Sequence, residues 1–407
     1  MRKKLAFVGT PDYPIPAIRG GAIQTLVTAL IDKNEEIGEY DIVVYTIYDS
    51  EINTIKFSRT EIVGIRQSFL GKIKLFVRKV LRRLTNNRIS YRSEYMSKIN
   101  KELLKKKYDY VIFETTDKEV VQLDPRVKRT AKILYHIHAD YINDNTDRIS
   151  NIADLVDVFV GVSDFISFRL RNVKALENAK IVTLYNAIEE NKIEEDERSE
   201  WRKKVRLKYG LKDSDMVFLY CSRLSPEKGC LELEKALLKL DKKAKLLVIG
   251  GTNFNSNAQT KYLRTLQNLA SNNKGRIHYT GAIEHKLVNQ YMVAADIAVV
   301  PSVCNEAASL TLLEFRSLEL PTIATNIGGI PEFTNSESTV LVDYDSDFID
   351  NLSKAMNKVM NDLDLRKSLQ INTKKDMSKF YYSSYYHRFK ELINSLGYNN
   401  DNEEFKR

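Results

Sequence analysis

The sequence predicts an α/β protein with two doubly wound parallel-sheet domains. Short apolar runs alternate with amphipathic stretches of helical length, which is typical of buried parallel strands joined by helices. The 407 residues are too many for one ordinary core and fit two domains of about 200 residues each. Hydrophobic residues make up 43% of the chain, which is enough for two cores. We therefore expect two Rossmann-like domains.

The apolar runs that we predict to be strands are bounded by Gly, Asp or Pro. They are Leu5–Val8, Asp41–Tyr45, Tyr110–Phe113, Ile133–Ile137, Val158–Val162, Val217–Cys221, Lys245–Ile249, Arg276–Tyr279, Ile297–Val300 and Thr322–Thr325. Between them, stretches such as Ile23–Asn34 and Leu231–Leu240 carry apolar residues at helical spacing. Strands separated by helices in this way favour βαβ units.

A charged stretch marks the expected boundary between the domains. Ile188–Lys204 is poor in apolar residues, and a new strand begins near Val217, so we interpret this stretch as a linker. The expected domains are residues 1–187 and 188–378. Residues 379–407 then contain a last helix, around Tyr381–Leu396, and a polar tail.

Cysteine usage and hydropathy bear on the compartment. Cys221, Cys230 and Cys304 show no CxxC or Cys/His spacing, which indicates neither a disulfide framework nor a zinc site and favours a reducing compartment. The apolar run at Leu5–Gly9 is too short for a signal peptide, and no run approaches the ~18 apolar residues of a membrane span. We expect a cytoplasmic protein, at most peripheral on the inner face of the cell membrane.

The excess positive charge belongs to one segment. Residues 66–107 hold 14 Lys and Arg against two acids, a larger surplus than the net charge of +9 for the whole chain. Within it, residues 70–84 place an apolar helical face between flanking cations, as in helices that bind anionic lipid. A core helix with a basic solvated side is the alternative. Nucleic-acid binding is not expected, because no DNA- or RNA-binding motif accompanies the charge.

The first of three motifs in the second half is Tyr220–Gly229, directly after a predicted strand. Loops at the carboxyl ends of parallel strands are where doubly wound folds bind ligands. Arg223 and Lys228 share this loop and suit a diphosphate, the Arg through a forked contact and the Lys as a point charge. The alternative is an ordinary solvated loop.

The second motif is Val300–Glu314. Ser309 is a suitable N-cap for a helix that starts at Leu310, and the free N–H groups there would favour a phosphate. Glu306 precedes this helix and Glu314 lies in its second turn, so the two carboxylates can reach different hydroxyl groups of one ligand. For Glu314 the alternative is an ion pair with Arg316 or Arg223.

Glycine pairs follow two other predicted strands. In the third motif, Leu320–Glu332, the residues Gly328 and Gly329 permit close approach of the backbone to a ligand. In the first half, Gly20 and Gly21 open an amphipathic helix whose N–H groups could face a phosphate. Neither pair forms a GxGxxG or Walker A motif, so a dinucleotide or ATP site is not supported.

Together these motifs resemble family 4 of the retaining glycosyltransferases, also called glycosyl transferases group 1. The resemblance rests on Arg-Leu-Ser-Pro-Glu-Lys-Gly, Pro-Ser-x3-Glu-x7-Glu and Gly-Gly-Ile-Pro-Glu, in order over about residues 217–335. It implies the GT-B fold, in which two Rossmann-like domains face a cleft and the C-terminal helix crosses back to the first domain. Two departures concern the donor sugar: Ala307-Ala-Ser stands where Gly-Phe-Gly is frequent, and Glu319 where Gly is common.

The resemblance also implies roles for the motif residues. Arg223 and Lys228 would neutralise the donor diphosphate. Glu306 would contact hydroxyls of the transferred sugar, and Glu314 would bind the ribose. The backbone at Ser309–Leu310, with Gly20 and Gly21, would hold phosphate.

One of the five histidines matches a family histidine near the reacting carbon. His138 ends the strand 133–137 and is the better match, whereas His136 lies on the same face two residues earlier. We therefore predict His138 and Glu306 as catalytic residues. The family usually works without a metal, so no metal or other cofactor is expected.

The function that follows is transfer of a sugar from a nucleotide-sugar donor to a glycan or lipid-linked acceptor, in bacterial cell-surface polysaccharide synthesis such as capsule formation. Two alternatives stay open at this level. One is a non-catalytic GT-B protein that binds glycan or a partner enzyme. The other is a GT-B sugar-nucleotide epimerase, which acts without an acceptor.

Overall fold

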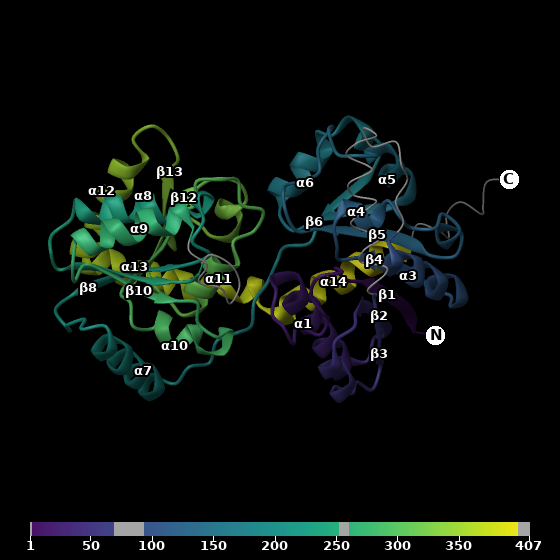
Figure 1. Ribbon diagram of the computed structural model, residues 1–407, viewed down its shortest axis with the longest axis horizontal. Coiled ribbons are helices and arrows are strands. Elements are labelled where there is room, and N and C mark those ends of the chain that lie inside the picture. Colours follow the sequence, from purple (N-terminus) through teal and green to yellow (C-terminus); the bar gives the residue numbers. More distant parts are fainter. Residues whose placement is uncertain (1, 69–92, 252–259, 398–407) are drawn as a thin grey trace. The chain divides into compact units, whose positions relative to one another are not determined.

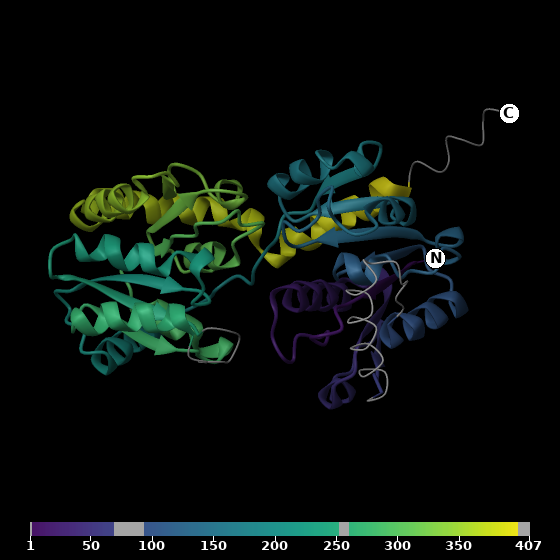
Figure 2. The same ribbon diagram turned by 45° about the horizontal axis from the view of Figure 1, so that its top comes forward.

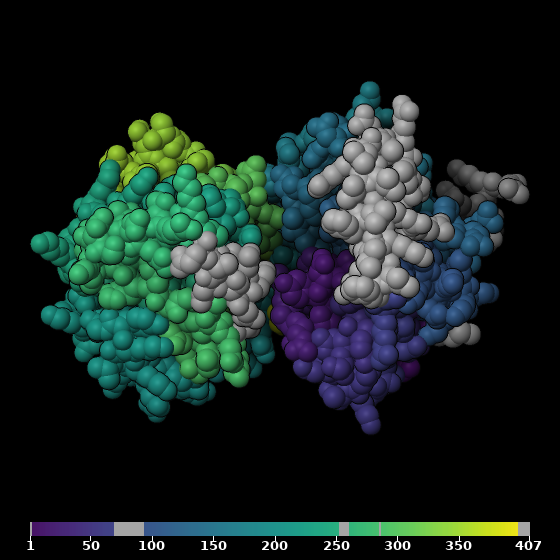
Figure 3. Space-filling view, in the orientation of Figure 1, coloured from purple at the N-terminus to yellow at the C-terminus, as the bar shows by residue number. Residues whose placement is uncertain are grey.

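The computed structural model describes residues 2–68, 93–251 and 260–397, which form two compact units. Unit 1 comprises Met1–Asn186 and Tyr385–Arg407, and unit 2 comprises Ala187–Ser384. In Figures 1 and 3 the purple-to-blue residues gather in unit 1 and the green residues in unit 2. The basic segment 70–84 lies outside the described residues. Within them, no helix combines the length and apolar character needed to cross a membrane.

Unit 1 is built on a seven-stranded parallel sheet with the order β3-β2-β1-β4-β5-β6-β7. The strands are β1 Lys3–Val8, β2 Tyr40–Ile47, β3 Thr60–Ile65, β4 Tyr110–Phe113, β5 Lys132–Ile137, β6 Val158–Gly161 and β7 Lys180–Thr183. The helices are α1 Ala22–Ile37, α3 Glu94–Lys105, α4 Asp117–Val120, α5 Ile149–Leu155 and α6 Asp164–Arg171, with shorter 3-10 turns at Ser50–Thr54, Val127–Arg129 and Lys174–Leu176. Buried side chains fill both faces of the central strands, as expected where helices cover both sides.

Unit 2 repeats the plan with six parallel strands in the order β10-β9-β8-β11-β12-β13. They are β8 Met216–Cys221, β9 Ala244–Ile249, β10 Ile277–Gly281, β11 Ile297–Val300, β12 Thr322–Asn326 and β13 Thr339–Asp343. The helices are α7 Glu195–Lys208, α8 Cys230–Leu238, α9 Lys261–Asn272, α10 Val288–Met292, α11 Leu310–Ser317, α12 Phe348–Asn361 and α13 Leu363–Asp376. One core joins α8, α9 and α12 to the sheet, and Figure 2 shows helices on both sides of the strands.

The last helix, α14 (Tyr382–Gly397), leaves unit 2 and packs on unit 1, as the resemblance implied. Its Phe389 ring lies 6.1 Å from the rings of both Phe7 and Tyr40. The Tyr386 hydroxyl donates to Asn34 on α1 over 3.0 Å, and Figure 1 shows α14 beside α1. The apolar and aromatic positions that predicted this helix are therefore the positions that it buries.

All ten predicted strands are present, but the sequence analysis missed β3, β7 and β13. Each of these three lies at an edge of its sheet. Only the first and last residues of β3 and two residues of β13 are buried, and β7 has no buried residue, so none of the three is buried along its length. An edge strand has one neighbour and partial solvent exposure, which weakens its sequence pattern.

The interpretation of residues 188–204 as a linker is wrong from Glu195 onward. Helix α7 begins there and belongs to unit 2. Its Arg206 is buried and forms an ion pair with Asp296 at 2.7 Å, while Arg202 binds the same carboxylate. These charged residues, which the sequence suggested to be solvent-exposed, therefore bind α7 to the segment between α10 and β11.

Candidate active site

The three motifs of unit 2 meet at the carboxyl ends of β8, β11 and β12, which are neighbours in the sheet. Gly229, with φ +71°, approaches Pro301 so closely that a Cβ there would lie 1.7 Å from the carbonyl oxygen. A Cβ on Gly328 would lie 2.6 Å from the backbone nitrogen and oxygen of Glu306, and Gly329 N–H donates to that oxygen over 2.7 Å. In this structure these glycines let the three loops pack against one another.

A partly buried ion pair joins the first two motifs. Lys228 Nζ lies 2.6 Å from Glu306 Oε1, and the Ser302 hydroxyl donates to the same oxygen over 2.6 Å. Both side chains of the pair are less than one-fifth exposed. Ser302, which the sequence analysis did not select, thus helps to orient Glu306. Within the described residues the second oxygen, Oε2, has no hydrogen-bond partner, so it can accept from a ligand hydroxyl.

Helix α11 starts where the sequence placed it. Ser309 is the N-cap, and its hydroxyl accepts from Leu312 N–H over 3.4 Å. This contact leaves the N–H groups of Leu310 and Thr311 at the first turn unpaired within the helix. Such an N-terminus favours a negatively charged group.

Glu314 lies in the second turn of α11 and is half-buried. Burial raises the pKa of its carboxyl to about 7, and no nearby cation among the described residues opposes the effect. Arg316 instead pairs with Asp376 at 2.6 Å, and Arg223 faces Glu227. The alternative in which Glu314 pairs with Arg316 or Arg223 is therefore not found, and the carboxylate is available to a ligand.

Arg223 differs from Lys228 in how firmly it is held. Its side chain is 44% exposed, and the nearest carboxylate, on Glu227, lies 3.5 Å away. The Glu227 carboxylate is more tightly bound by the Ser225 hydroxyl at 2.6 Å. Arg223 can therefore turn toward an anion without breaking a strong contact, whereas Lys228 is fixed beside Glu306.

In unit 1, Gly20 and Gly21 precede α1 with φ values of +74° and +104°. Gly21 is the N-cap of α1 and forms no side-chain cap, so the first N–H groups of the helix have no capping partner. A Cβ on Gly20 would meet nothing within 4 Å, so this glycine borders open space. The pair opens the helix as the sequence predicted.

His138 follows β5 and contacts a carboxylate that the sequence analysis missed. Its Nε2 lies 2.7 Å from Glu114 Oε2, and His136 Nδ1 lies 3.1 Å from the same oxygen. Glu114 directly follows β4, which pairs with β5. An acid at the end of a buried strand was a visible signal, but only the strand order shows that it faces these histidines.

Glu114, His136 and His138 are also a group that could hold a metal, since their ligand atoms lie within 4.8 Å of one another. The 2.7 Å separation of Glu114 Oε2 and His138 Nε2 is a hydrogen-bond distance. It is shorter than the roughly 3.3 Å between ligand atoms that surround a tetrahedral zinc ion. The geometry therefore fits a hydrogen-bonded cluster better than a zinc site.

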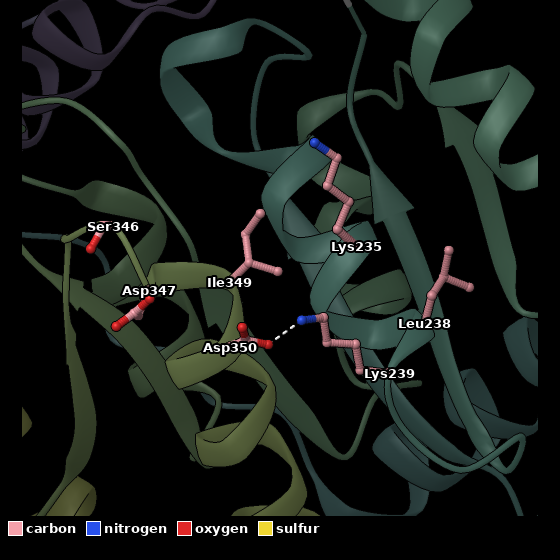
Figure 4. A pocket seen from close by; sticks show the side chains of 7 residues that line it. All are labelled: Lys235, Leu238, Lys239, Ser346, Asp347, Ile349 and Asp350. Atoms are coloured by element: carbon pink, nitrogen blue, oxygen red, sulfur yellow. Dashed lines mark hydrogen bonds and ion pairs between the residues drawn. The ribbon is translucent and has the colours of Figure 1, made fainter.

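A surface pocket of about 440 Å³ lies elsewhere on unit 2 and contains none of the predicted site residues. Figure 4 shows its lining by α8 and by the start of α12, with an ion pair between Lys239 and Asp350. Its cations, Lys235 and Lys239, are balanced by Asp347 and Asp350. We therefore assign it no part in the site.

Comparison with known proteins identifies the class. The structure of Anabaena Alr3699/HepE in complex with UDP matches over 97% of this chain and all of that chain, with a TM-score of 0.71 at 17% identity. Two parallel-sheet units with a returning C-terminal helix and this likeness define the GT-B fold.

Sequence comparison then gives the family. Residues 201–376 match the family described as glycosyl transferases group 1. The Bacillus subtilis protein YtcC, provisionally named a glycosyltransferase, is 25% identical over 390 residues, which is 93% of this chain and 88% of that protein. A GDP-mannose-dependent mannosyltransferase of Corynebacterium glutamicum is 30% identical over 167 residues, covering 39% and 41% of the two chains. Residues 201–376 thus match the group 1 glycosyl transferases, and the protein is a glycosyltransferase.

Proposed function

We propose that this glycosyltransferase moves a sugar from a nucleotide-sugar donor to a glycan or lipid-linked acceptor in bacterial cell-surface polysaccharide synthesis, with retention of anomeric configuration. Similar proteins support the donor class: one mannosyltransferase is named for its dependence on GDP-mannose, and Alr3699/HepE was solved with UDP-glucose. The acceptor and the retaining outcome follow from the motif resemblance.

One arrangement carries the proposal. At the carboxyl ends of β8, β11 and β12, the cation Lys228, the open N-terminus of α11 and the carboxylates of Glu306 and Glu314 lie on adjoining loops. A nucleotide sugar has a diphosphate flanked by hydroxyl-bearing rings. The cation and the helix N-terminus suit the diphosphate, and the two carboxylates suit hydroxyls on either side of it.

The chemistry needs little acid or base from the protein. The bond from the anomeric carbon to the diphosphate oxygen breaks, and a bond from that carbon to the acceptor oxygen forms on the same face. The departing diphosphate takes the acceptor's proton. Lys228, Arg223 and the start of α11 stabilise the negative charge that grows on the leaving group, which is where electrostatic catalysis acts.

The direct test is a thermal-shift screen with UDP-, GDP- and dTDP-sugars, followed by assay of transfer. We expect one nucleotide sugar to raise the melting temperature, because a ligand that binds only the folded state stabilises it. K228A should weaken that shift, whereas K235A, which removes an exposed lysine of α8, should not. Donor incubated without acceptor should stay unchanged. If no nucleotide sugar shifts the melting temperature and none is transferred, the proposal is refuted. If the donor is epimerised in the absence of acceptor, the protein is an epimerase instead.

We further propose that the enzyme works at the cytoplasmic face of a membrane, held by the basic residues of 70–84. The support is the sequence pattern of cations beside apolar residues. Sedimentation with vesicles should show binding to phosphatidylglycerol and none to phosphatidylcholine, and replacement of Lys72, Lys74 and Arg78 by Gln should weaken it. Equal sedimentation with both lipids would contradict an electrostatic anchor.

A further inference from the structure

We propose that Glu114 is the positioning residue of His138: its carboxylate accepts the Nε2 hydrogen of the imidazole and leaves Nδ1 to accept a hydrogen bond from a substrate hydroxyl. The use of His138 by substrate rests on the proposed function. The arrangement of Glu114 and His138 in the free protein does not, so the two can be tested separately.

The sheet register brings the cluster together. In the pairing of β4 with β5, Phe113 lies opposite Tyr135, so the next step along both strands sets Glu114 beside His136. His138 comes two residues later on the same face of the strand. The two rings lie 4.2 Å apart, and both reach Glu114. One carboxylate is thus shared by two imidazoles at the carboxyl edge of the sheet.

Contacts with the two histidines keep the carboxylate of Glu114 ionised. Burial disfavours an ionised Glu114, but the two histidines outweigh burial and hold the pKa of Glu114 well below its usual range. An ionised carboxylate can only accept hydrogen bonds, so both ring nitrogens that face it must carry hydrogen. For His138 this nitrogen is Nε2.

At neutral pH the lowered pKa of His138 favours its neutral form. Burial lowers the pKa of His138, and the neighbouring His136 lowers it further, against the raising effect of Glu114. A neutral imidazole with hydrogen on Nε2 has a lone pair on Nδ1. His138 therefore enters the reaction as a hydrogen-bond acceptor at Nδ1.

The two histidines differ in access. His136 is 2% exposed, and its Nε2 is a buried atom without a hydrogen-bond partner. The His138 side chain is 10% exposed, and its Nδ1 is not among the buried unpartnered atoms of the described chain. Of these two described histidines, His138 is thus the one that can offer a ring nitrogen to a ligand, and Glu114 determines which nitrogen that is.

The first test reads the tautomer without any assay. The chain has five histidines, so ¹⁵N-histidine labelling gives few imidazole signals, and H136Q and H138Q assign two of them. We expect hydrogen on Nε2 of His138 in the wild type, a mixture of tautomers in E114A and no change in E119Q. Glu119 is a suitable control because it follows the same strand and binds the hydroxyls of Thr115 and Thr116 instead. Hydrogen on Nδ1 of His138 in the wild type would overturn the proposal.

The second test uses transfer kinetics with the substrates found in the thermal-shift screen. E114A should lower kcat/KM by about 100-fold, the scale of a misplaced catalytic contact. E114Q should lose less, because its amide oxygen can still accept from Nε2. The double variant E114A/H138N should be no worse than H138N, since Glu114 acts through His138. Additive losses, or an E114A effect equal to that of E119Q, would overturn the proposal. So would stabilisation of the free protein by Zn²⁺ that E114A abolishes.

Discussion

Two buried or half-buried glutamates stand at corresponding edges of the two sheets and behave in opposite ways. Glu114, after β4 of unit 1, touches two histidines that hold its pKa well below the usual range despite burial. Glu314, in the helix that follows β11 of unit 2, meets no such partner, and burial raises its pKa to about 7. The partner, and not the degree of burial, decides the charge of a carboxylate at these edges.

This contrast separates two kinds of site residue. Glu114 has its hydrogen-bond partners within the protein, and we propose that it acts by orienting His138. Glu314 has no such partner among the described residues, and burial disfavours its charged form. Under the proposed function the unit 2 edge receives the donor, so the strongest effects of substitution on transfer are expected there.

The largest expected effect is on transfer by E306Q. The substitution keeps the shape of Glu306 but removes the charge that pairs with Lys228 and the strong acceptor for a sugar hydroxyl. We expect the transfer rate to fall about 10²- to 10³-fold, as for loss of one transition-state hydrogen bond. Steady-state kinetics measure this loss of transfer rate. The control is E337Q, which changes an exposed glutamate. A loss smaller than that of E114A would reverse the ranking of the two edges.

Replacing Glu314 with Gln should stabilise the free protein at alkaline pH. The folded pKa of about 7 lies above the usual 4.5, so stability from this group is present below 4.5 and is lost as pH rises toward 7. At about pH 8, E314Q should exceed the wild type by about 2 to 3 kcal/mol in free energy of unfolding, and at about pH 4.5 the two should agree. Urea unfolding at both pH values measures the gap. A constant gap would show that the charge of Glu314 is not the cause.

E114Q should change stability in the opposite sense. The folded pKa of Glu114 is lowered, so its contribution is present above the usual 4.5 and is lost as pH falls through the folded value. At neutral pH the variant should be less stable than the wild type by about 2 kcal/mol, the scale of a hydrogen bond to a charged group. The gap should narrow in urea unfolding below pH 4.5. E119Q, measured alongside, should not show that narrowing.

The smallest expected effect is a change in the free energy of unfolding from a substitution just after the helix that carries Glu314. Just beyond helix α11, Glu319 has a left-handed conformation, φ 57°, and Leu320 N–H donates to Phe315 O. This C-terminal cap favours glycine at position 319. E319G should therefore raise the free energy of unfolding by about 1 kcal/mol and leave transfer unchanged. Its ion pair with Lys374 is exposed and should matter little, which K374A checks. A destabilised E319G would mean that the cap is not strained.

The sequence anticipated much of unit 2's site because its residues are local in the chain. Each motif directly follows a strong apolar strand, and Ser309, Leu310 and the order of the loops could be read from adjacent residues. Glu319, which departs from the family pattern, lies in the C-terminal cap that follows α11. The contacts inside the site, such as Lys228 with Glu306 across 78 positions of sequence, could not be read in this way.

Fold class, ten of the strands and the last helix were determined by the sequence alone. Nine of these ten are inner strands, and burial on both faces leaves a pattern in consecutive residues. The edge strands β3, β7 and β13, the helix α7 and the Glu114–His138 contact were decided only in the tertiary structure. Each depends on a partner distant in the chain: a single neighbouring strand, the carboxylate of Asp296, or the register of β4 against β5. Such partners leave no local pattern, since the stabilising contact exists only once the sheet has formed.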